Sequence, residues 1–260
     1  MVAAGDIASC DGEGDSETAQ LIAAMDDDVV VATLGDNVYP SGSEATYAEC
    51  YDPAWGSFLE RTRPAIGNHD AEGDGGAAYH AYFGQLAGTS GAAWYSYEIG
   101  DWHAIVLDSN CGLVGCDPGT PQHDWLVADL AASDATCTLA YWHHPRFTSG
   151  LHGEITATGP FWDALDAAAA DLVLAGHDHH YERFAPQAAD GSPDPDGIRE
   201  LIVGTGGADL YPTTRVAPNS ERIIVGALGV LELTLHDDSY DWRFLTIDGA
   251  EADAGSADCQ

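Results

Sequence analysis

The sequence contains no lysine, and its eight basic residues, all arginines, face 43 aspartates and glutamates. The formal charge of -35 repels nucleic acid and anionic lipid, which argues against a general DNA- or RNA-binding protein. Long apolar runs are also missing, since none approaches the roughly 18 residues that a membrane-spanning helix requires. We therefore expect a protein that binds neither nucleic acid nor a membrane.

The acidic excess has a second implication. An Asp- and Glu-rich, lysine-free surface stays soluble in strong brine, because dissolved ions screen the repulsion between its charges. We expect a salt-adapted protein whose fold loses stability when that screening is removed.

Cysteines are few, at positions 10, 50, 111, 116, 137 and 259, and none forms a CxxC zinc motif. An even number outside such motifs favours disulfides, for which six cysteines allow many pairings. We favour Cys111–Cys116, which closes a short glycine-containing loop, together with Cys10–Cys50 and Cys137–Cys259. Disulfides indicate an oxidising compartment. We therefore expect a secreted or extracytoplasmic protein in mature form, its export signal removed and Met1 added as a start.

Short apolar segments alternate with helical ones along the chain. Strands are expected at Val2–Ile7, Val29–Leu34, Pro64–Ile66, Trp94–Ile99, Trp102–Leu107, Cys137–Trp142, Leu172–Ala175, Leu201–Val203, Val225–Leu235 and Tyr240–Ile247. Helices are expected at Ser16–Met25, Thr120–Ala131 and Pro160–Ala170. This alternation predicts an α/β protein, and no segment resembles a linker between two cores.

Five of the expected strands end at a cluster of Asp, Asn or His. The clusters are Gly5-Asp6, Gly35-Asp36-Asn37-Val38-Tyr39, Gly67-Asn68-His69-Asp70, Trp142-His143-His144-Pro145 and Gly176-His177-Asp178-His179. Ligands of open α/β sheets bind at the carboxyl ends of the strands, so we expect the clusters to form one site. Carboxylate, imidazole, amide and phenolate donors together suit iron, zinc or manganese. The glycine that opens four clusters is expected to allow a tight turn off the strand.

The clusters resemble those of the calcineurin-like metallophosphoesterase superfamily, and within it the purple acid phosphatase branch. The superfamily pattern GD, GD, GNH(D/E), H and GHxH occurs here in order across residues 5–179. The marks of the branch are GDxxY, present from Gly35 to Tyr39, and GHxHxYER, present from Gly176 to Arg183.

The resemblance implies a four-layer α-β-β-α sandwich with two mixed β-sheets in a single domain. We expect the catalytic domain to span residues 1–250 and a tail to span 251–260, anchored by a disulfide at Cys259. Plant members of the branch carry a further N-terminal β-sandwich domain, which we expect this chain to lack because its first cluster begins at residue 5.

The resemblance also implies a role for each ligand. Asp6, Tyr39 and His179 would bind a first metal, which is Fe(III) in the family. Asn68, His143 and His177 would bind a second metal, a divalent Fe, Zn or Mn, and Asp36 would bridge the two. Many superfamily members begin with GDxH, whereas this chain has Ala8 at the histidine position, and Tyr39 looks like the replacement.

Further residues near the clusters are candidates for substrate contact. His69 and His152 stand where the family places histidines that bind the substrate or donate a proton. Arg146 is close enough in sequence to attract phosphate, whereas Arg183 is expected to form a structural ion pair. The family block H-x-P selects His143 as the ligand and leaves His144 as a neighbour or a substrate contact. We expect structural roles for the remaining histidines, His80, His103, His123, His180 and His236.

These roles predict a dinuclear-metal phosphohydrolase that cleaves monoesters of phosphorylated small molecules by in-line attack of metal-bound hydroxide. The second metal-based possibility is a phosphodiesterase acting on small phosphodiesters, an activity that the superfamily also includes. A non-catalytic secreted protein that binds metal or phosphate is the alternative outside catalysis. Loops over 40–63 and 205–222 are expected to shape specificity, and no oligomeric state is predicted.

Overall fold

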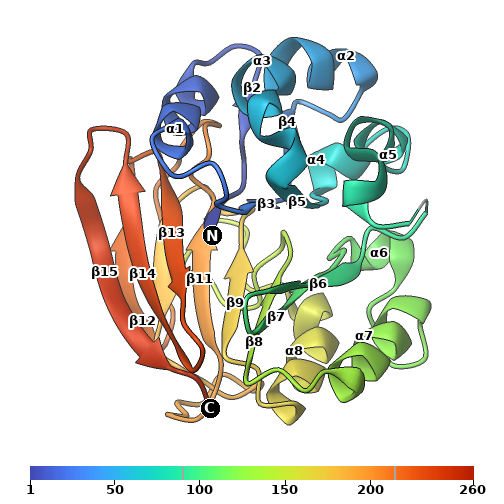
Figure 1. Cartoon of the computed structure of the whole chain (residues 1–260), viewed down its shortest axis with the longest axis vertical. Coiled ribbons are helices and arrows are strands. Elements are labelled where there is room, and N and C mark those ends of the chain that lie inside the picture. The colour runs from blue at the N-terminus through green and yellow to red at the C-terminus, as the bar shows by residue number, and fades with distance from the viewer. Residues whose placement is uncertain (90, 214) are drawn as a thin grey trace.

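Two large β-sheets pack against each other in the computed structural model, which describes residues 1–89, 91–213 and 215–260 (Figure 1). The first sheet has the strand order β15 (Glu251–Asp258), β14 (Ser239–Thr246), β13 (Gly229–Leu235), β1 (Val2–Ala4), β3 (Val31–Leu34) and β5 (Thr62–Ala65). The second has the order β12 (Ser220–Ile224), β10 (Tyr181–Phe184), β11 (Arg199–Val203), β9 (Leu172–Ala175), β8 (Cys137–Tyr141), β7 (Trp102–Val106) and β6 (Tyr95–Ile99). A small parallel pair joins β2 (Ala8–Ser9) to β4 (Val38–Tyr39).

Both large sheets are mixed. In the first, β1, β3 and β5 pair in parallel, and β13 joins β1 in antiparallel fashion. In the second, β7, β8, β9 and β11 pair in parallel, while β6, β10 and β12 are added through antiparallel pairings. The parallel strands of each sheet therefore point their carboxyl ends toward one edge, where ligand sites of such sheets form.

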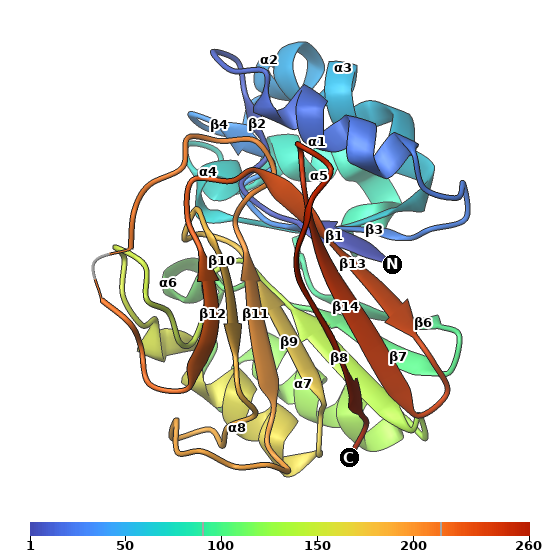
Figure 2. The same cartoon turned by 90° about the vertical axis from the view of Figure 1, so that its left-hand side faces the viewer.

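Helices cover the outer faces of the two sheets (Figure 2). On the side of the first sheet lie α1 (Gly14–Ala23), α2 (Glu44–Thr46), α3 (Asp52–Trp55), α4 (Asn68–Ala71) and α5 (Ala77–Phe83), with the turns η1 (Tyr47–Tyr51), η2 (Gly56–Arg61) and η3 (Gly84–Ala87). On the side of the second lie α6 (Cys111–Val114), α7 (Pro121–Ala132), η4 (Thr156–Thr158) and α8 (Gly159–Ala167). The predicted four-layer sandwich is confirmed.

Two apolar cores hold these layers together. Between the sheets, side chains such as Leu34, Leu174 and Leu231 are fully buried. Between the second sheet and its helices, Trp142 and Trp162 are fully buried. Each core removes large aliphatic and aromatic groups from water, the dominant favourable term in folding.

Residues 40–63, expected to be a loop, are instead mostly helical. Tyr47, Tyr51 and Trp55 of this segment are buried, and their rings pack on one another at centroid distances of 6.0 and 6.3 Å. These three aromatic residues, each four positions from the next, place their rings on one face, a pattern too short to stand out in the sequence.

The C-terminal segment also differs from the expected tail, since Glu251–Asp258 forms β15 and pairs with β14 along its length. Its sequence contains no large apolar residue, so no strand pattern marks it. Gly255 lies so close to the Trp242 ring that an added Cβ would fall 2.3 Å from it. Contact with β14 thus orders this edge strand.

All three predicted disulfides are present: Cys10–Cys50, Cys111–Cys116 and Cys137–Cys259. The third connects the start of β8 in the second sheet to the residue after β15 in the first, which confirms the anchor at Cys259. Within the described residues, no helix combines the length and the apolar character needed to cross a bilayer.

Candidate metal centre

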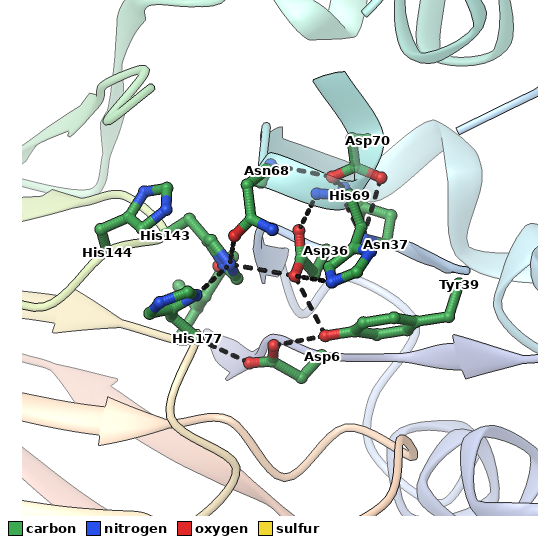
Figure 3. Close-up of polar contacts among 12 residues, drawn as sticks. Asp6, Asp36, Asn37, Tyr39, Asn68, His69, Asp70, His143, His144 and His177 are labelled. Carbon is green, nitrogen blue, oxygen red and sulfur yellow. Dashed lines mark hydrogen bonds and ion pairs between the residues drawn. The ribbon is translucent and has the colours of Figure 1, made fainter. Parts of the chain in front are cut away.

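Strands of both sheets deliver polar side chains to one place (Figure 3). β1 leads into Asp6, β3 into Asp36, β5 into Asn68, β8 into His143 and β9 into His177. We call the set of seven expected ligands the ligand cluster: Asp6, Asp36, Tyr39, Asn68, His143, His177 and His179.

One half of the ligand cluster consists of Asp6, Tyr39 and His179. The Tyr39 hydroxyl lies 2.7 Å from Asp6 Oδ1 and 3.1 Å from His179 Nε2. His179 Nε2 in turn lies 3.2 Å from Asp6 Oδ1. Three potential ligand atoms thus surround one small volume.

The other half consists of Asn68, His143 and His177. His143 Nε2 lies 3.2 Å from Asn68 Oδ1 and 3.2 Å from His177 Nδ1. Asp36 joins the halves, because its Oδ2 is 3.1 Å from Tyr39 Oη and 3.1 Å from His143 Nε2. The structure therefore brings all seven expected ligands together, with Asp36 between the two groups.

Three of the expected ligands, and one of the glycines before them, have left-handed backbone conformations. Asp6, Asp36 and His177 have φ angles of 60°, 47° and 68°, a region that non-glycine residues rarely adopt. Among the glycines that open the clusters, only Gly35 has a positive φ, of 81°. Gly67 is needed for space, since a Cβ there would lie 2.1 Å from Asp36 N. Gly35 therefore supplies a left-handed backbone conformation at its turn, and Gly67 supplies the space that its turn needs.

Burial and neighbouring charge shift the pKa values of several ligands. Burial opposes the charged form of His143, but the carboxylates of Asp36 and Asp6 outweigh it and raise this pKa to about 9. Burial also opposes the charged form of Asp6, but His179 and His143 outweigh it and lower the pKa of that carboxyl. Burial, together with Asp6 and Asp36, raises the pKa of the Tyr39 phenol. A cation binding here would compete with protons and release them.

The donor atoms fit a pair of cations. Asp6, Asp36 and His143 each offer one ligand atom within 4.8 Å of the others. Burial and the neighbouring His143 lower the pKa of His177, which leaves its ring neutral with a lone pair to offer. Buried carboxylates normally pair with charge or bind metal, and oxygen and imidazole donors suit Fe, Zn or Mn.

His69 and His152 lie at the border of the ligand cluster. His69 Nδ1 contacts the Pro40 carbonyl at 2.6 Å, while its Nε2 lies 4.0 Å from Asp36 Oδ2. His152 Nδ1 lies 3.0 Å from Asp178 Oδ1, and its ring packs 4.2 Å from that of His177. Both rings are partly exposed, so a substrate can reach them.

Arg146 contacts its own segment and the start of α8. Its guanidinium packs on the Phe147 ring at 4.6 Å, and its Nε lies 3.7 Å from the position of a Cβ built on Gly159 in α8. Contact of Arg146 with the substrate stays a prediction. Arg183 pairs with Asp253 and Glu221, as its expected structural role requires.

The structure also shows the contacts of His144 and His180, two histidines that stand next to expected ligands in the sequence. His144 Nδ1 contacts Ser109 Oγ at 2.8 Å, and burial together with His143 lowers its pKa to about 3, so the ring is neutral. His144 also offers a ring nitrogen within 4.8 Å of those of His143 and His177, so it lies beside the ligand cluster. His180 is buried and contacts Glu182 Oε2 at 3.0 Å, as a structural role predicts.

Sequence reasoning missed Tyr211 and the role of Asp178. The Tyr211 hydroxyl donates to the His177 carbonyl at 2.8 Å, and its ring stacks on His179 at 4.5 Å. Tyr211 belongs to an irregular segment with no spacing pattern, so nothing in the sequence marks it. Asp178 lies inside a recognised motif, but its contact with His152 depends on a loop whose path only the structure shows.

Residues 2–181, more than half of the chain, match the family model of the calcineurin-like phosphoesterases. The chain belongs to this family. Among curated relatives, purple acid phosphatase 18 of Arabidopsis thaliana is 27% identical over 187 residues, covering 63% of this chain and 42% of its own length. An uncharacterized protein of Mycobacterium tuberculosis is 32% identical over 194 residues, covering 66% of this chain and 36% of its own length.

Solved structures share the fold. A purple acid phosphatase from yellow lupin (Lupinus luteus) seeds has a TM-score of 0.75 at 18% identity, covering 99% of this chain and 53% of its own. GAP50, the anchor in the inner membrane complex of Plasmodium, has a TM-score of 0.76 at 15% identity, covering 100% and 88%. The chain is a calcineurin-like phosphoesterase of the purple acid phosphatase branch, and it spans less than half the length of the curated relatives it matches.

Proposed function

We propose that this phosphoesterase is a dinuclear-metal enzyme that hydrolyses phosphate monoesters. The observation that carries the proposal is Asp36 Oδ2, which lies 3.1 Å from Tyr39 Oη in one ligand group and 3.1 Å from His143 Nε2 in the other. The group with Tyr39, Asp6 and His179 would hold Fe(III), and the group with Asn68, His143 and His177 a divalent Fe, Zn or Mn. When bound, two such cations acidify water and neutralise charge on the phosphoryl group.

His69 and His152 act on the substrate through their Nε2 atoms. In each ring Nδ1 is already held by a protein acceptor, the Pro40 carbonyl for His69 and the Asp178 carboxylate for His152. In each ring, Nε2 is then the nitrogen left to meet a bound substrate. His69 then stabilises the phosphoryl oxygens, and His152 protonates the departing alkoxide.

The three disulfides support a site of action outside the reducing cytoplasm. We place the protein in a secreted or extracytoplasmic setting on that ground. Its substrates there would be phosphorylated small molecules.

The proposal is tested by replacing the bridging carboxylate. Asp36→Ala should lose both metals by elemental analysis and lower kcat for an aryl phosphate monoester by at least about 1000-fold, because both ligand groups depend on it. Asp27→Ala, at an exposed position, is the matched control and should keep metal content and rate. Near-wild-type turnover by Asp36→Ala would contradict the site.

Assays on the purified, metal-loaded protein distinguish the monoesterase from a phosphodiesterase and from a non-catalytic binding protein. Comparing kcat/KM for an aryl monoester and the matching diester identifies the preferred ester class, and a higher value for the diester would favour the phosphodiesterase. Full metal content without hydrolysis of either ester would favour a binding protein. Iron at the Tyr39 position should give a visible absorption band that Tyr39→Phe removes.

A further inference from the structure

A small hollow of about 480 Å³ lies beside the ligand cluster. One wall is α6, and the other is the segment from Ile155 to Ala157; Cys111 Sγ and the Ala157 carbonyl, 3.4 Å apart, mark where they meet. The lining residues are Ser109, Asn110, Cys111, Gly112, Leu113, His144, Ile155 and Ala157.

This hollow and the ligand cluster share a wall. The His144 ring lies between them, at centroid distances of 4.5 Å from His177 and 4.9 Å from His143. Asn110 Nδ2 donates to the carbonyl of Gly67, the residue before Asn68, at 3.3 Å. A group bound in the hollow therefore lies next to the expected ligands of the proposed divalent cation.

The chemistry of the hollow differs from that of the rest of the surface. The chain has 43 acidic residues, yet none of the eight lining residues carries a carboxylate or a guanidinium. The polar groups at its base already have protein partners, since Ser109 Oγ contacts His144 Nδ1 and Asn110 Nδ2 donates to Asp108. Leu113 is 70% exposed, and Ile155 lines the same space. Covering these apolar groups with an apolar ligand is favourable, and the lining residues offer no charge that would bind a polar ligand.

We propose that this hollow receives the organic group of the phosphate ester and selects esters of aromatic or branched apolar alcohols over esters of small polyols. The proposal rests on the proposed function, because the phosphoryl group must sit on the ligand cluster for its organic group to reach the hollow. An apolar contact of this size changes substrate preference by roughly tenfold or more.

Binding is tested first, without turnover. The full chain with labelled methyl groups is titrated with 1-naphthol, and methyl resonances are followed by NMR with and without added metal. The Leu113 and Ile155 methyl signals should shift, while those of Val127, an exposed residue of α7, should not. Unshifted Leu113 and Ile155 signals would overturn the proposal.

Specificity is tested with Leu113→Ser, whose position is exposed enough that folding should not suffer, and with Val127→Ser as the matched control. Leu113→Ser should lower kcat/KM for 1-naphthyl phosphate about tenfold, mainly through KM, and leave glycerol 1-phosphate within about twofold. An equal effect on both esters would overturn the selective role. If naphthol shifts the Leu113 methyls but neither ester is hydrolysed, the proposed function fails while the hollow stands as a binding site for neutral apolar alcohols.

Discussion

Asp6, Asp36 and His177 place their side chains in the ligand cluster from backbone with positive φ angles. Such conformations cost about 1–3 kcal/mol each and persist only where the surroundings fix them. Here the His177 N–H donates to Asp6 Oδ2 at 2.8 Å, and the His69 N–H donates to Asp36 Oδ1 at 2.8 Å. The ligands are therefore held in place by their own neighbours.

Gly67→Ala tests this close fit. The new methyl would lie 2.1 Å from both Asp36 N and Asp36 Oδ1, so the bridging carboxylate must move. We expect metal content to fall to one ion or fewer per chain, as measured by elemental analysis. Gly12→Ala is the control, because its nearest neighbour would be 3.9 Å away, and it should bind metal normally. Full metal content in Gly67→Ala would show that the fit is not required.

Between His143 and His152, neighbouring strands hold the connecting segment through buried acids. Glu200 of β11 accepts the backbone N–H groups of Arg146 and Phe147 at 2.9 and 3.0 Å. Glu182 of β10 accepts the N–H of Ser149 at 2.8 Å. These carboxylates replace the backbone partners that a helix or strand would supply, so an irregular segment keeps a fixed path.

The Glu200 carboxyl makes stability depend on pH. Burial raises its pKa from 4.5 to about 8, so the folded chain binds a proton that the unfolded chain releases. Its contribution to the free energy of unfolding should therefore be greatest below pH 4.5 and fall as pH rises to 8, by on the order of 4 kcal/mol. Urea unfolding of metal-free protein from pH 5 to 8 measures this. The Glu200→Gln variant should have a lower free energy of unfolding, and this free energy should change less with pH. If it changes with pH as much as in the unmodified chain, Glu200 is not the group responsible.

Sequence patterns located the elements that carry the ligand cluster better than those that surround it. Leu172–Ala175 was predicted to the residue, because a buried apolar run is followed directly by glycine and histidine. Strands β10, β12 and β15 were missed: Tyr181–Phe184 carries Glu182 and Arg183, and Ser220–Ile224 is half polar. Their pairing depends on neighbouring strands, which a local pattern does not record.

The same limit applies within the site. The seven expected ligands could be predicted from motif order, since each stands near a strand end that the sheets bring together. Tyr211 and the Asp178–His152 contact depend on how two loops cross, and no local spacing encodes that.

Over the whole molecule, acidic side chains far outnumber their partners. Several arginines are already committed: Arg183 and Arg199 both pair with Glu221, and Arg243 pairs with Glu232 and Glu251. Most carboxylates therefore lack a basic partner and repel one another through solvent. Salt at 0.1 M largely screens this repulsion between charges more than about 10 Å apart.

Salt should therefore stabilise the fold. We expect the Tm to rise by several degrees between low salt and about 2 M KCl, as measured by calorimetry. Replacing the exposed run Asp26, Asp27 and Asp28 by asparagine should raise the Tm at low salt and reduce its salt dependence. A Tm that does not change with salt in the unmodified chain would contradict the predicted salt adaptation.

The first strand of the chain lies inside its sheet, between β13 and β3, and the Ala208 N–H donates to the Asp6 carbonyl at 2.9 Å. A nascent chain emerging from the ribosome carries Asp6 and Asp36 long before it carries the segments that fix them. The proposed cation site can therefore close only after the segments up to β13 have been synthesised, so metal binding would follow the synthesis of these segments.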